Sequence, residues 1–178
     1  DIYLQKSYVS KYNGWLIINK NIGISSAKVV NKIKKIMDIK KLMAEAIKLS
    51  VEHKHTTKPN PVVGALLYTN GKIVSSGAHE YFGGPHAEVN CIDKVDPDIK
   101  KEDLTLFCTL EPCNHTGKTP PCTEKIISSG IKKIVIGVVD PNPLVSGQGI
   151  KKLKDAGIDV TVGVLEEEIK SSNEFYFF

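Results

Sequence analysis

The 178-residue sequence contains no arginine, so all 24 of its basic residues are lysines. A phosphate group bound by this chain would therefore meet lysine charges, backbone N–H groups or hydroxyls, and never a bidentate guanidinium fork. Genome composition bias accounts for such a pattern. The net charge of +4 is too small to indicate a nucleic-acid partner by itself, and we do not expect one.

Long apolar runs are also absent, since no segment approaches the roughly 18 residues of a membrane span. Residues 1–10 lack the basic start and apolar stretch of a signal peptide. The four cysteines could form two disulfides, but no export signal supports that reading. We therefore expect a cytoplasmic protein with reduced thiols and no membrane partner.

The remaining composition is that of a globular domain, with 41% hydrophobic residues, and from residue 42 onward strands alternate with short helices. Asn70-Gly71 marks a hairpin between two of the strands. This alternation predicts a three-layer α/β/α domain over residues 42–178, with a mostly parallel or mixed central sheet covered by helices on both faces. The expected helices are 42–53, 86–95, 121–129 and 149–156; the expected strands are 62–69, 72–78, 104–110, 133–139 and 160–164.

Residues 1–41 have a different pattern and form an N-terminal appendage. Residues 15–18 are a short apolar strand candidate, Ser25 and Ser26 offer a helix N-cap, and apolar residues recur at helical spacing over 27–37. This segment is too small to bury a core of its own.

Four residues in order along the chain carry chemistry: His86, Glu88, Cys113 and Cys122. One imidazole and two thiolates suit zinc and leave a fourth position for water. A neighbouring carboxylate that is not needed as a ligand can move protons. The alternative is that the cysteines are small core residues and His86 belongs to a loop. The order of all four residues, with prolines beside them, favours the metal site.

Helix geometry constrains how these residues could meet. Two positions apart on a regular helix, His86 and Glu88 would point roughly 200° apart, so we place them at a helix start, where both can face the metal. Cys122 would open the helix that follows Pro120-Pro121, and a helix N-terminus favours thiolate.

The pattern His86-Ala87-Glu88 with Pro112-Cys113 resembles the cytidine-deaminase-like zinc hydrolases. Most members close the site with Cys-x-x-Cys, whereas here eight residues, 114–121, separate the two cysteines. That insert is similar to one branch of the family, the pyrimidine deaminases of riboflavin biosynthesis. The resemblance covers residues 42–175 and includes the segments 58–64, 77–79, 84–88, 140–143 and 147–150.

The resemblance implies hydrolytic deamination of 2,5-diamino-6-ribosylamino-4(3H)-pyrimidinone 5′-phosphate, with one Zn²⁺ per chain. His86, Cys113 and Cys122 would hold the zinc, and Glu88 would carry protons between water, a ring nitrogen and the leaving ammonia. The implied substrate-binding residues are Asn60, His79, His115, Lys118, Asp140 and Asn142. Taken singly, Asn60 and the Asp140-Asn142 segment are equally good turn residues, and Lys118 is an ordinary solvated lysine.

Two further expectations are structural. Cys91 and Cys108 lie on predicted buried faces and should be core residues. Glu111 precedes Pro112 in the family motif, and we expect it to accept backbone N–H bonds rather than take part in catalysis.

Residues 13–26 resemble the start of tRNA pseudouridine synthases. The segment that carries the catalytic Asp in that family is missing here, so we expect residues 1–41 to have no pseudouridine activity.

Three readings of the whole chain stay open. The first is the phosphorylated-pyrimidine deaminase. The second is a nucleic-acid base deaminase of the same superfold, which the long Cys–Cys loop disfavours. The third is a non-catalytic zinc domain, which a three-ligand site disfavours. Relatives often continue into an NADPH-dependent reductase domain, for which this chain has no length, so a separate reductase chain and a homo-oligomer are both left open.

Overall fold

The computed structural model describes residues 9–12, 15–18, 25–115, 120–143 and 145–177. The chain divides into two compact units, Asp1–Asp38 and Ile39–Phe178. The division falls inside one helix, α1 (Ser26–Val51). The sequence predicted two helices here, over 27–37 and 42–53, and this was wrong because residues 38–41 contain neither glycine nor proline to end a helix.

The described part of the first unit comprises a two-stranded sheet and the start of α1. β1 (Val9–Tyr12) pairs antiparallel with β2 (Trp15–Ile18). β2 has the predicted bounds, whereas β1 was not predicted. The hydroxyl of Ser25 accepts the backbone N–H of Lys28 at 3.3 Å, which is the predicted N-cap.

The second unit is built on a five-stranded sheet in the order β4-β3-β5-β6-β7. β3 runs antiparallel to both β4 and β5, while β5, β6 and β7 run parallel. The strands are β3 (Gly64–Thr69), β4 (Lys72–Ala78), β5 (Thr105–Leu110), β6 (Lys133–Val138) and β7 (Asp159–Val162). The sheet is therefore mixed, because β3, which the predicted Asn70-Gly71 hairpin joins to β4, runs opposite to the other four strands.

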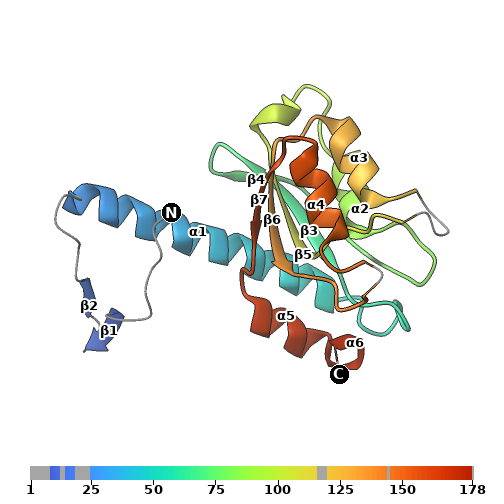
Figure 1. Ribbon diagram of the computed structural model, residues 1–178, viewed down its shortest axis with the longest axis horizontal. Coiled ribbons are helices and arrows are strands. Elements are labelled where there is room, and N and C mark those ends of the chain that lie inside the picture. Colours follow the sequence, from blue (N-terminus) through green and yellow to red (C-terminus); the bar gives the residue numbers. More distant parts are fainter. Residues whose placement is uncertain (1–8, 13–14, 19–24, 116–119, 144, 178) are drawn as a thin grey trace. The chain divides into compact units, whose positions relative to one another are not determined.

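Helices cover both faces of this sheet, as the α/β/α prediction required (Figure 1). On one face α2 (Ala87–Asp93), α3 (Cys122–Ser129) and α4 (Gln148–Asp155) bury a core that includes Ile126, Ile136 and Leu153. On the other face the end of α1 and α5 (Glu166–Ser172) bury a second core around Phe107. α6 (Glu174–Phe177) follows α5, and a 3₁₀ turn, Lys101–Asp103, precedes β5.

Cys91 and Cys108 are fully buried in the first core, which confirms their predicted role. Burial raises the pKa of the Cys91 thiol to about 12, so it stays protonated and behaves as a small apolar side chain. None of the helices in the described ranges is long and apolar enough to cross a membrane.

Strand directions gather four loops at one edge of the sheet. Gly64, which starts β3, lies opposite Ala78, which ends β4. Leu110, which ends β5, pairs with Val138, which ends β6. The loops that follow β4, β5 and β6 and the loop that precedes β3 therefore meet at this edge. The carboxyl edge of parallel strands is where open α/β sheets bind ligands.

Candidate metal centre and pocket

His86 and Glu88 lie at the start of α2, as the sequence predicted. His86 is the N-cap residue, with an extended backbone at ψ 160°, and Glu88 is in the first turn. α2 can pack this closely because residue 77 in β4 is glycine: a Cβ there would lie 2.5 Å from the backbone nitrogen of Cys91 and 2.7 Å from the carbonyl oxygen of Ala87. A side chain at Gly77 would push the helix, and with it both site residues, off the sheet.

Cys113 and Cys122 approach each other from the two ends of the insert. Cys122 is the first residue of α3, and its backbone N–H points at the Cys113 sulfur, at a distance of 3.4 Å. The Thr123 N–H donates to the Cys113 carbonyl at 3.2 Å. The positive end of the α3 dipole therefore faces the Cys113 sulfur, which favours thiolate there.

The three ligand candidates form a compact triad. His86 Nδ1 lies 3.1 Å from Cys122 Sγ and 3.5 Å from Cys113 Sγ, and all three ligand atoms lie within 4.8 Å of one another. Nitrogen and sulfur ligands at ordinary zinc distances would be about 3.6 Å apart in a tetrahedron. The donor set and its spacing fit zinc. Within the described residues no fourth His, Cys, Asp or Glu joins the group, which is typical of a catalytic rather than a structural site.

In the metal-free triad the two thiols have very different pKa values. Hydrogen bonding from Cys122 lowers the pKa of the Cys113 thiol to about 4. The same hydrogen bond, together with burial, raises the pKa of the Cys122 thiol, and hydrogen bonding to Cys113 raises the pKa of His86. Cys113 is thus the first thiolate, and a divalent cation would supply the charge needed to ionise both sulfurs.

Glu88 is the buried carboxyl group beside this triad. Its residue is 3% exposed, and loss of hydration raises its pKa, while nearby His86 lowers it by a smaller amount. A carboxyl group with a raised pKa can both take up and release a proton near neutral pH.

The residues of this region line one pocket of about 260 Å³. The pocket brings together the described residues that the sequence proposed for catalysis and substrate binding, with two of the three ligands. Cys122 is fully buried and does not line the pocket, and Lys118 falls outside the described residues. The lining residues are Asn60, Pro61, Val63, His79, His86, Glu88, Leu110, Glu111, Cys113, His115, Asp140, Asn142, Val145 and Tyr176.

His79 and Asn60 form a hydrogen-bonded pair at the pocket wall. His79 Nδ1 lies 3.1 Å from the Pro85 carbonyl oxygen, so this nitrogen carries the hydrogen. Burial lowers the pKa of His79, so the ring is neutral and Nε2 accepts from the Asn60 amide nitrogen at 3.1 Å. The pair therefore fixes the orientation of the Asn60 amide and leaves its oxygen as the acceptor.

Glu111 has the predicted structural role. Its Oε2 accepts the backbone N–H groups of Asp140 and Gly147, at 3.2 and 2.9 Å, and its Oε1 accepts that of Ile150 at 3.1 Å. One buried carboxylate thus joins the end of β5 to the loop after β6 and to the first turn of α4. These bonds fix the backbone immediately before Cys113.

Asp140 and Asn142 lie in the loop after β6, and sequence reasoning missed one of their partners. The Asn142 N–H donates to Asp140 Oδ1 at 2.9 Å, which is the turn that the segment predicts. Tyr176 of α6 donates its hydroxyl to Oδ1 at 3.0 Å and to Oδ2 at 3.2 Å. Burial, followed by the nearby Asp140 charge, raises the pKa of Tyr176. Nothing in the sequence around Tyr176 signals this contact.

A mixed sheet between helical layers, with this triad and a buried glutamate at its edge, defines the cytidine-deaminase-like class of zinc proteins. Residues 37–138, more than half of the chain, match the family described as the cytidine and deoxycytidylate deaminase zinc-binding region. The chain belongs to that family.

Two curated relatives are similar to this chain over most of its length. The chain is 51% identical over 138 residues to the riboflavin biosynthesis protein RibD of Aquifex aeolicus, covering 78% of this chain and 38% of that protein. It is 46% identical over 135 residues to the diaminohydroxyphosphoribosylamino-pyrimidine deaminase of Buchnera aphidicola, covering 76% of this chain and 90% of that protein. The chain thus spans well under half of the RibD protein but nearly the whole of the shorter deaminase.

Two solved structures are also similar to this chain. The deaminase/reductase of Thermotoga maritima is 48% identical with a TM-score of 0.75, covering 80% of this chain and 41% of that chain. The Aspergillus oryzae Rib2 deaminase, solved in complex with DARIPP, is 28% identical with a TM-score of 0.55, covering 74% of this chain and 89% of that chain. These likenesses confirm the predicted fold class.

Proposed function

We propose that this chain is a zinc-dependent hydrolase that deaminates 2,5-diamino-6-ribosylamino-4(3H)-pyrimidinone 5′-phosphate in riboflavin biosynthesis. The proposal rests on the three-ligand triad of His86, Cys113 and Cys122, beside which the buried Glu88 lines the same pocket as His86 and Cys113. Relatives that bear the name of this deaminase, and the Rib2 complex with DARIPP, support the choice of substrate.

The reaction replaces the amino group on C2 of the pyrimidine by oxygen. A water oxygen forms a bond to C2, the bond from C2 to the exocyclic nitrogen breaks, and ammonia leaves. When bound, zinc supplies Lewis acidity that makes water nucleophilic near neutral pH. Glu88 takes one proton from the water and delivers it to a ring nitrogen. It then takes the second proton from the hydroxyl group formed on C2 and gives it to the leaving amine.

The other pocket residues bind and orient the substrate. Asn60, held by His79, reads the pyrimidine edge with its amide oxygen. Asp140 and Asn142 accept and donate hydrogen bonds at the ribose. His115, which is exposed at the start of the insert, would meet the phosphate together with Lys118, because the chain has no arginine for that task.

Ammonia release tests the proposal. Zinc-loaded protein should release one ammonia per pyrimidine consumed, and chelation should abolish release until zinc is restored. Cytidine and tRNA serve as comparison substrates for the base-deaminase reading. Release from cytidine or tRNA but none from the ribosylaminopyrimidine would contradict the substrate, and no release from any of the three would contradict a deaminase.

A further inference from the structure

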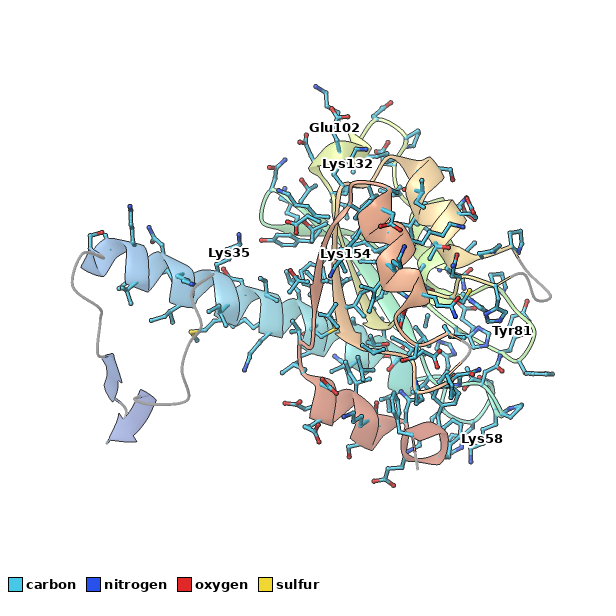
Figure 2. The ribbon with its side chains drawn as sticks, viewed as in Figure 1. Lys35, Lys58, Tyr81, Glu102, Lys132 and Lys154 are labelled. Carbon is cyan, nitrogen blue, oxygen red and sulfur yellow. The ribbon has the colours of Figure 1, made fainter. Side chains whose placement is uncertain are left out.

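The last two helices contact the loop that carries Asn60. Asn173, between α5 and α6, is 1% exposed. Its Oδ1 accepts the Val62 N–H at 2.7 Å, and its amide nitrogen donates to the Val62 carbonyl at 3.1 Å. On the other side of Asn60 is Lys58, which is labelled in Figure 2. Its Nζ lies 5.4 Å from the ring centroid of Phe175 in α6. The Val62 backbone and the Lys58 side chain, on the two sides of Asn60, thus both contact this helical segment.

The same segment also contacts the loop after β6. The Tyr176 hydroxyl donates to both carboxylate oxygens of Asp140, and the Asn142 N–H adds a second donor at Oδ1. A carboxylate offers about four acceptor positions, so this arrangement holds the group in one orientation and leaves capacity for a ligand. Tyr176 and Asp140 both line the pocket.

We propose that Tyr176 is a positioning residue of the substrate site, which acts by orienting the Asp140 carboxylate toward the hydroxyl groups of a ribosylated ligand. An ionised carboxylate only accepts hydrogen bonds, so the matching ligand groups are donors, and sugar hydroxyls are donors. Asn173 ties the segment that carries Tyr176 to the loop that carries Asn60. The Asn60 loop, which would contact the base, and the Asp140 loop, which would contact the sugar, therefore keep a fixed spacing. This inference rests on the proposed function, since it takes the ligand to be a ribosylated pyrimidine.

The substitution Tyr176→Phe removes the hydroxyl and keeps the ring. The Asp140 carboxylate then turns more freely, both in the substrate complex and in the transition state. Because binding is weakened equally in these two states, KM for the ribosylaminopyrimidine phosphate should rise about tenfold while kcat stays within about twofold. Zinc content should not change. Tyr68→Phe is the matched control, because Tyr68 packs in the same apolar layer as Tyr176 without lining the pocket, and its KM should equal that of the wild-type protein.

A double-mutant cycle with Asp140→Asn tests whether Tyr176 acts through Asp140. In that background Tyr176→Phe should change KM by less than about twofold, because the oriented charge is already gone. The inference is overturned by an unchanged KM in Tyr176→Phe, by an equal tenfold effect in both backgrounds, or by loss of zinc or of the folded state in the single variant. A wild-type protein without turnover would instead overturn the proposed function.

Discussion

The environment of Glu88 differs from that of an ordinary surface carboxyl group. It is buried beside three metal-ligand candidates, yet its carboxylate is not one of them. Burial makes it a better proton acceptor than a surface glutamate, because desolvation disfavours the charged form. Its position in the first turn of α2 brings it to the pocket together with His86.

The substitution Glu88→Gln should separate metal binding from turnover. The amide keeps the size of the side chain but cannot carry the proton, so kcat should fall by a factor of about 10² to 10⁴. Zinc content, measured by atomic emission on the purified protein, should stay at one per chain. A variant that retains full activity would remove Glu88 from the mechanism.

The raised pKa of Glu88 also predicts a pH dependence of stability in the metal-free protein. The folded state binds this proton more tightly than the unfolded chain, whose pKa is near 4.5. The stabilisation is therefore complete below about pH 4.5 and is lost as pH rises through the folded pKa. The free energy of unfolding of wild type minus that of Glu88→Gln, from urea titrations, should fall as pH increases above 4.5. A difference that stays flat or rises would show that the folded pKa is not raised.

At the scale of elements, the site depends on helix starts that approach the sheet edge closely. Gly149, in the first turn of α4, lies against the carbonyl of Pro112, the residue before Cys113. A Cβ at Gly149 would lie 2.1 Å from that carbonyl oxygen and 3.2 Å from Glu111 Oε1. The backbone cannot accommodate such a contact without moving either α4 or the Cys113 loop.

The substitution Gly149→Ala should therefore weaken both the fold and the metal site. We expect a loss of about 2 kcal/mol or more in the free energy of unfolding, since extra atoms are forced into packed structure, and a reduced zinc affinity in competition with a chromogenic chelator. Lys151→Ala, on the exposed side of the same helix, is the control and should leave zinc affinity unchanged. Wild-type zinc affinity in Gly149→Ala would show that the α4 contact does not position Cys113.

Elements with a strong local signal were predicted well. The Asn70-Gly71 hairpin gave β4 its observed bounds, and Gly130, with φ +86°, ends α3 as expected. α5 and α6 were not predicted, because their fit depends on distant partners such as Val62 and Asp140. The metal triad could be predicted because histidine and cysteine are rare residue types and occur here in the order that the family has. The role of Tyr176 could not be predicted, since it comes only from its contact with Asp140.

At the scale of the whole molecule, the described second unit contains both cores, the triad and the pocket. The described residues that line the pocket all belong to the second unit, Ile39–Phe178. The prediction that residues 1–41 have no pseudouridine activity stays a prediction.

Zinc should stabilise the second unit by linkage, because the triad joins α2, α3 and the loop after β5. With free zinc at about 100 times its Kd, the gain is about 2.7 kcal/mol, which corresponds to a rise in Tm of about 5–10 °C. Scanning fluorimetry of the protein with and without a chelator measures this rise in Tm. Cys122→Ser should remove most of the zinc-dependent rise, and a rise of equal size in that variant would place the metal elsewhere.

The central claim is that water replaces the C2 amino group of a ribosylaminopyrimidine phosphate in this pocket. The most direct test incubates zinc-loaded protein and that substrate in water labelled with heavy oxygen, followed by mass spectrometry of the pyrimidine. We expect a product that has lost one amino nitrogen and gained one labelled oxygen at C2, and no such product from Glu88→Gln. Recovery of unchanged substrate after incubation with zinc-loaded protein, or a product without the label, would contradict the replacement of the C2 amino group by water.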